Sequence, residues 1–135
     1  MQDTIFAFAT PPGQSALAVV RISGPDCARL ASEIIRWPLE PRKAELVWVR
    51  DPSCGDIIDQ AIALWFPSPA SFSGEDCLEL HVHGGRAVRH SLAEVLVRFA
   101  NVRPAESGEF VRRAFVNGKI DLAELEGLAD LLRGA

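Results

Sequence analysis

In the run from Cys77 to His83, every second residue is a large aliphatic one. Successive side chains of a β-strand point to opposite faces, so Leu78, Leu80 and Val82 would point to the core. The opposite face would carry Cys77, Glu79, His81 and His83. The run therefore predicts a half-buried strand, and it identifies the side chains that face away from the core.

Further strands are predicted where short apolar runs lie between turn-forming residues. These runs are Thr4–Ala9, Leu17–Ile22, Ala44–Arg50 and Ile57–Phe66. Apolar residues at helical spacing predict helices after Ser23-Gly24-Pro25, after Gly84-Gly85, from Gly108 to about Val116, and after Asp121. Strands and helices interleave without a regular βαβ rhythm, which favours an α+β fold with a mixed sheet and flanking helices.

Short local patterns predict the ends of the last two helices. Ser107 is a candidate N-cap for the helix that starts near Gly108. Asn117-Gly118 is a typical helix stop, and Asp121 with Glu124 three residues later resembles a capping box. The final helix carries an apolar stripe made of Leu122, Leu125, Leu128, Ala129 and Leu132. Because little chain remains for this stripe to pack on, it docks on the sheet, on a partner beyond Ala135 or on another subunit.

Composition and charge indicate a soluble globular domain. Of the 135 residues, 48% are hydrophobic and 24% are charged, and the formal net charge is −4. The sequence has no run of basic residues, so the isolated chain is a poor candidate for binding nucleic acid through its phosphates. Cys27, Cys54 and Cys77 are far apart, which argues against a disulfide framework or a four-cysteine zinc site. We find neither a signal peptide nor a membrane-length apolar stretch, and we expect a cytoplasmic protein.

The polar face of the Cys77–His83 strand has three interpretations. Glu79, His81 and His83 have the ligand types of a zinc or non-haem iron site, although nothing else supplies an obvious further ligand. The face can also be a plain solvent-exposed side of the sheet. The third interpretation is a small-molecule pocket, in which the Glu79 carboxylate accepts paired N–H donors from a 2-amino-4-oxo pyrimidine ring such as a pterin. Arg21 and Lys119 are then candidate cations for the carboxylate tail of the ligand.

Other motifs for nucleotide binding or catalysis are missing from this sequence. There is no G-x-x-x-x-G-K-[ST] phosphate loop. The stretch 117–121 is similar to the Asn-Lys-x-Asp motif that reads guanine in GTPases, but an inserted glycine spoils the spacing. Gly84-Gly85 can either bind an anion through backbone N–H groups or form a tight turn between strand and helix, and we favour the turn. Cys77 and His81 can meet on a strand face, but a nucleophile also needs an orienting group and an oxyanion site.

Four blocks of residues follow one another in a recognisable order. They are Asp3-Thr4-Ile5 with Ala9-Thr10-Pro11-Pro12-Gly13; Val20-Arg21-Ile22-Ser23-Gly24; Ser71-Phe72-Ser73-Gly74-Glu75-Asp76 with Glu79-Leu80 and His83-Gly84-Gly85; and Gly108-Glu109-Phe110 with Arg113-Ala114-Phe115 and Asn117-Gly118-Lys119-Ile120-Asp121-Leu122. Any one block is a weak signal. Together, over nearly the whole chain, they resemble the tRNA-modification GTPases called MnmE or TrmE.

The resemblance implies a fold similar to the folate-binding domain of the glycine-cleavage T-protein, and a homodimer formed through this module. It also implies a bound 5-formyl-tetrahydrofolate, standing in for the one-carbon donor 5,10-methylene-tetrahydrofolate. The family's folate contacts fall on Arg21, Glu79 and Lys119. We expect Glu79 to read the pterin edge, Arg21 and Lys119 to serve anionic and carbonyl groups, and the chain itself to hold no catalytic residue.

The resemblance further implies a division of the chain and a larger protein around it. We expect residues 1–118 to form the tetrahydrofolate-binding and dimerisation domain, and residues 119–135 to begin a helical domain. Full-length members continue into a domain that hydrolyses GTP with potassium and magnesium, and into a carboxy-terminal cysteine motif. Together with the flavoprotein MnmG they modify C5 of wobble uridine in tRNA by a carboxymethylaminomethyl-type modification. The resemblance implies no membrane partner.

The chain departs from the family pattern in two places. Gln14-Ser15-Ala16 stands where the family has Arg-Gly-Gly, which makes that loop less flexible and less basic. Ser107 stands where the family has proline, at the entry to a short helix. Two alternative functions stay open, a stand-alone folate-dependent one-carbon transferase and a metal-binding domain built on Glu79, His81 and His83.

Overall fold

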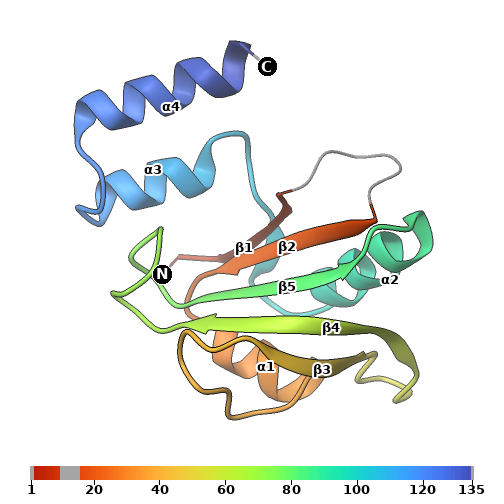
Figure 1. The fold of residues 1–135 in the computed structure, drawn as a ribbon. Coiled ribbons are helices and arrows are strands. Elements are labelled where there is room, and N and C mark those ends of the chain that lie inside the picture. The colour runs from red at the N-terminus through yellow and green to blue at the C-terminus, as the bar shows by residue number, and fades with distance from the viewer. Residues whose placement is uncertain (1, 10–15, 135) are drawn as a thin grey trace.

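The computed structural model describes residues 2–9 and 16–134 of the chain. Its six described strands form one sheet in the order β3-β4-β5-β2-β1-β6 (Figure 1). The strands are β1 (Thr4–Phe8), β2 (Leu17–Ser23), β3 (Glu45–Arg50), β4 (Ile57–Phe66), β5 (Cys77–His83) and β6 (Val102–Pro104). The helices are α1 (Cys27–Ile34), α2 (Arg86–Val97), α3 (Glu109–Val116) and α4 (Leu122–Gly134). The predicted loop around Gln14 and Ser15 lies outside the described residues.

The sheet is mixed, which confirms the predicted α+β class. β2 pairs antiparallel with both β1 and β5, and β4 pairs antiparallel with β3 and β5. β1 and β6 run parallel. We did not predict β6, because a strand of three residues that ends in a proline has no alternating pattern to read.

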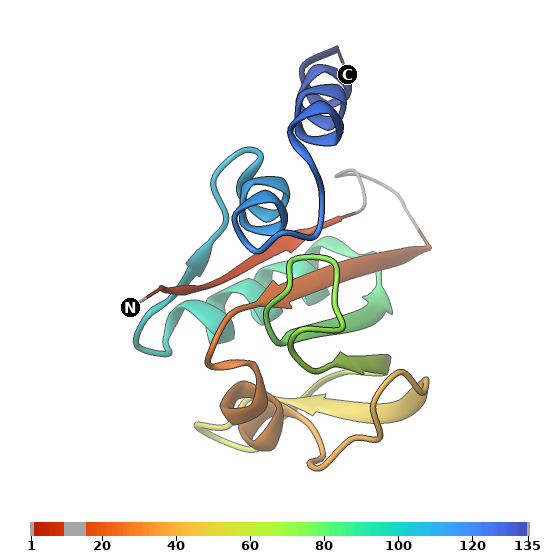
Figure 2. The ribbon, with the colours of Figure 1, turned by 90° about the vertical axis from the view of Figure 1, so that its left-hand side faces the viewer.

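Helices α1 and α2 cover the apolar face of the sheet. Leu78, Leu80 and Val82 of β5 are fully buried on this face, as the alternation predicted. The neighbouring strands and the two helices complete the core with Val20, Ile22, Leu30, Ile34, Leu92, Val95 and Leu96. Figure 2 shows α2 and α3 on opposite sides of β1, so α3 lies over the other face.

The predicted ends of the last two helices are confirmed at two of three places. Gly118, at φ 73°, ends α3 in a motif where the N–H of Lys119 donates to the Ala114 carbonyl at 2.8 Å. Asp121 and Glu124 form the predicted capping box, with reciprocal bonds of 2.7 and 3.1 Å. Ser107 is not the N-cap of α3.

The entry to α3 is built differently from our prediction. The helix starts one residue later, through Gly108 in the left-handed region at φ 74°, and no side chain caps it. The Glu109 carboxylate instead accepts the backbone N–H of Glu106 at 2.9 Å. A serine N-cap requires an extended backbone at the residue before the first turn, and Gly108 occupies that place in another conformation.

Helix α4 extends away from the sheet, beyond α3 (Figure 1). Leu122 and Leu128 of its apolar stripe are exposed, so these two side chains do not dock on the sheet. The side chains of Ala129 and Leu132 lie outside the described part of the chain. None of the described helices is long and apolar enough to cross a membrane.

Candidate ligand-binding pocket

The pairing register of the sheet places Arg21 directly opposite Glu79 on the face away from α1 and α2. The Arg21 Nε lies 3.2 Å from Glu79 Oε2. The other carboxylate oxygen, Oε1, lies 3.2 Å from the Nε2 of His81, two residues further along the same strand. Two partners therefore hold the Glu79 carboxylate in place, and its side chain is only 18% exposed.

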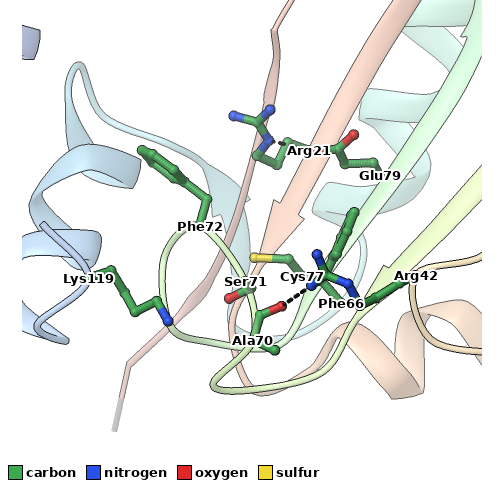
Figure 3. A pocket seen from close by; sticks show the side chains of 9 residues that line it. All are labelled: Arg21, Arg42, Phe66, Ala70, Ser71, Phe72, Cys77, Glu79 and Lys119. Carbon is green, nitrogen blue, oxygen red and sulfur yellow. Dashed lines mark hydrogen bonds and ion pairs between the residues drawn. The ribbon is translucent and has the colours of Figure 1, made fainter.

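Arg21, Glu79 and Lys119 line one pocket of about 390 Å³, although they come from three distant parts of the sequence (Figure 3). Arg21 and Glu79 lie on adjacent strands, and Lys119 lies just after the end of α3. The pocket is completed by Arg42, Phe66, Ala70, Ser71, Phe72 and Cys77. Among the described residues, its charged lining consists of three cations and one carboxylate.

The loop 67–76 forms one wall of this pocket and is fastened to the end of α3. The side-chain amide of Asn117 donates to the Ser73 carbonyl at 2.9 Å. Gly74, at φ 83°, packs so closely that a Cβ there would lie 2.7 Å from the Cβ of Asn117. The same loop carries Phe72, whose ring centre lies 5.9 Å from the Arg21 guanidinium carbon. The aromatic wall and Lys119 thus belong to one packed unit.

Residues that no sequence pattern indicated also line the pocket. Arg42 lies in the connection between α1 and β3, and Phe66 ends β4. Phe72 lies inside the block Ser71–Asp76, whose composition predicts only a loop. Nothing in the local pattern around Arg42 indicates a binding residue, because its place in the pocket depends on how two loops meet in space.

The histidines of β5 have partners other than a metal in this structure. His83 Nδ1 lies 2.8 Å from Asp59 Oδ1 on β4, and His81 pairs with Glu79. No group of three or more His, Cys, Asp or Glu residues within the described ranges is arranged to hold a metal ion. Gly84 makes the turn from β5 toward α2, and its N–H donates to the Ala16 carbonyl at 3.1 Å.

Residues 4–119 match the family described as "GTP-binding protein TrmE N-terminus". The chain belongs to this family. It is 55% identical over 130 residues to a "tRNA modification GTPase MnmE" of Beijerinckia indica, covering 96% of this chain and 29% of the relative. It is 48% identical to "5-taurinomethyluridine-[tRNA] synthase subunit GTPB3, mitochondrial" of Mus musculus, covering 97% of this chain and 27% of the relative. The chain thus spans less than a third of the length of these relatives.

Within this TrmE N-terminal domain, an ion-pair network ties α3 to the loop that walls the pocket. The Arg113 guanidinium lies 3.0 Å from Glu75 of the loop and 3.1 Å from Glu109 of its own helix. Glu109 also forms a bidentate ion pair with Arg103, through two hydrogen bonds of 2.8 and 2.7 Å. Ser23, at the end of β2, donates its hydroxyl to Glu75 at 2.7 Å. The network joins β2, β6, α3 and the loop.

A fall in pH should weaken this ion-pair network. The Arg103 hydrogen bonds lower the pKa of Glu109 from 4.5 to about 2. A depressed folded-state pKa stabilises the fold above the unfolded pKa, and this stabilisation is lost as the pH falls from 4.5 to about 2. We expect the melting temperature to fall across that interval and Glu109→Gln to flatten part of the fall.

The measurement is thermal unfolding followed between about pH 6 and pH 2. Asp51, whose pKa is lowered to about 2 mainly by its bonds to Ser53, contributes in the same window, so Asp51→Asn serves as a parallel variant. A Glu109→Gln protein with the same pH dependence as the wild type would contradict the prediction.

Proposed function

We propose that this chain is the folate-binding and dimerisation module of a tRNA-modification GTPase. The observation that carries the proposal is the pocket itself, where Arg21, Glu79 and Lys119 meet beside two aromatic rings. Its volume of about 390 Å³ lies within the usual range of small-molecule sites.

The side chains of the pocket fit a reduced folate group by group. The Glu79 carboxylate is acceptor-only when ionised and suits the paired N–H donors of a pterin edge. Phe66 and Phe72 offer apolar ring surface for flat groups. Arg21 and Lys119 serve the anionic and carbonyl groups of the ligand. When bound, 5-formyl-tetrahydrofolate or 5,10-methylene-tetrahydrofolate supplies a one-carbon unit.

Exposed apolar side chains on the sheet support the dimerisation part of the proposal. Leu46 and Trp48 on β3 and Leu17 on β2 share the face that carries Glu79, and these residues are 63%, 49% and 55% exposed. Large apolar side chains left exposed on one face of a sheet favour an interface there. We propose that residues 1–118 form the module, that a second copy covers this face, and that residues 119–135 begin a helical domain.

The rest of the proposed function lies outside these 135 residues. Because the relatives are named as tRNA modification GTPases, we propose that the full-length protein hydrolyses GTP, with potassium and magnesium, in a domain beyond this chain. It would act with MnmG at C5 of wobble uridine in tRNA. Residues 1–135 would contribute the folate-binding pocket and the dimer interface.

Calorimetric titration with 5-formyl-tetrahydrofolate tests the pocket. We expect one ligand per chain, and we expect Lys119→Ala to weaken binding about tenfold through the loss of a charge-assisted hydrogen bond. Lys43→Ala is the matched control, because Lys43 is exposed, pairs with Glu40 at 3.4 Å and does not line the pocket.

Light scattering on the same samples measures the mass in solution and should give two chains per particle. Failure of the wild-type chain to bind the ligand, or undiminished affinity in both Lys119→Ala and Glu79→Ala, would overturn the folate assignment. A single-chain mass at all concentrations would overturn the dimer assignment.

A further inference from the structure

Arg42 is a cation of the pocket to which the family's folate contacts assign no role. Its side chain lines the pocket, with the guanidinium carbon 5.6 Å from the centre of the Phe66 ring. One nitrogen, Nη1, donates to the Ala70 carbonyl at 3.2 Å. A guanidinium has five N–H donors in a fixed fork, so most of its donors remain for another acceptor.

The backbone of Arg42 is held in an unusual conformation. Its φ is 63°, in the left-handed region that few residues other than glycine adopt. Its N–H donates to the Trp65 carbonyl at 2.8 Å, and the preceding Pro41 forms a bridge with the same residue. The end of β4 therefore fixes the loop and directs the Arg42 side chain across Phe66. Strained residues of this kind often lie at functional sites.

The charges of the pocket are unevenly compensated. Arg21 is paired with Glu79 at 3.2 Å. Within the described ranges, neither Arg42 nor Lys119 lies within ion-pair distance of a carboxylate, although both line the pocket. Figure 3 shows these two side chains on opposite sides of the pocket, with Ala70 and Ser71 between them. Such a lining suits a ligand that brings carboxylates of its own.

We propose that Arg42 binds a carboxylate of the ligand's glutamyl group and so selects folates that carry this tail. The proposal rests on the proposed folate function and adds to it a residue and a specificity. Arginine suits this task because its planar fork can bond both oxygens of one carboxylate. The contact with the Phe66 ring and the hydrogen bond to the Ala70 carbonyl hold the guanidinium in place before the ligand binds. Less conformational entropy is therefore lost on binding.

The test compares two ligands that differ only in the tail. The probes are 5-formyl-tetrahydrofolate, with one glutamyl group, and the primary amide of 5-formyl-tetrahydropteroic acid, which keeps the amide but lacks the glutamyl carboxylates. Each is titrated into the wild type, Arg42→Gln and Arg42→Lys. We expect Arg42→Gln to weaken binding of the glutamyl ligand about tenfold and to change the affinity for the pteroyl amide less than about twofold. Arg42→Lys keeps the charge without the fork and should restore part of the loss.

Arg50→Gln is the matched control. Arg50 also donates its Nη1 to a loop carbonyl, that of Gly55 at 3.3 Å, but it lies outside the pocket. Equal weakening of both ligands by Arg42→Gln would assign Arg42 the role of a strap between loops and overturn the proposal. No weakening of either ligand would also overturn it. If the wild type binds neither ligand, the folate function fails and this inference fails with it.

Discussion

Glu79→Gln is expected to weaken 5-formyl-tetrahydrofolate binding at least about 100-fold. The substitution keeps the size of the side chain but replaces a charged acceptor with a neutral amide, one end of which is itself a donor. Two hydrogen bonds to a carboxylate, each worth about 1.5–3 kcal/mol, are then lost or reduced, and every 1.4 kcal/mol corresponds to about tenfold in affinity. This loss should exceed the effect of replacing Lys119 or Arg42.

The effect on binding has to be separated from an effect on folding. Glu94→Gln is the same chemical change on the exposed side of α2, where Glu94 pairs with Arg98 at 2.9 Å. Both variants should melt near the wild-type temperature, since Arg21 can be hydrated when its partner loses charge. A Glu79→Gln protein that melts normally and binds as tightly as Glu94→Gln would remove Glu79 from the site.

Arg113→Met is expected to lower the free energy of unfolding by about 3 kcal/mol. The Arg113 side chain is 8% exposed and neutralises two carboxylates, those of Glu75 and Glu109. Removing one partner of a buried ion pair leaves charge without compensation, which typically costs about 3–5 kcal/mol. We place the loss at the lower end because Ser23 still bonds Glu75 and Arg103 still bonds Glu109.

The neighbouring arginine provides the control for this prediction. Arg112 is 56% exposed and pairs with Glu106 at 3.5 Å. Exposed pairs contribute about 0–1 kcal/mol, so Arg112→Met should be nearly neutral. Urea unfolding of the two variants measures the difference. Equal stability of Arg112→Met and Arg113→Met would show that the network contributes little to the fold.

Several features of the fold were predictable because their causes lie within a few residues of one another. The alternation in β5 predicted both the strand and its buried face. The helix stop at Gly118 and the capping box at Asp121 depend on hydrogen bonds between residues that are three to five positions apart. The prediction for Ser107 was wrong because a serine before an acidic helix start is a good cap in general, and nothing local indicated that Gly108 would take its place.

Other features depended on contacts between distant residues. β6 exists because Thr4–Phe6 of β1 pairs with it from nearly 100 residues away. Arg42 lines the pocket because its loop is bound to the end of β4 and its side chain reaches Ala70. No spacing within the sequence encodes such contacts directly, since they depend on the register and packing of the whole sheet.

The run Cys77–His83 shows where the boundary lies. By itself, the sequence determined that Glu79 faces away from the core, because the two-residue period of a strand leaves no other choice. Only the tertiary structure decided what Glu79 meets there. The register of β2 against β5 places Arg21 opposite it. Gly74 of the loop packs against Asn117 at the end of α3, and Lys119, two residues further along, lines the same pocket. A strand's faces are a local property, whereas a pocket is made of side chains that only long-range packing brings together.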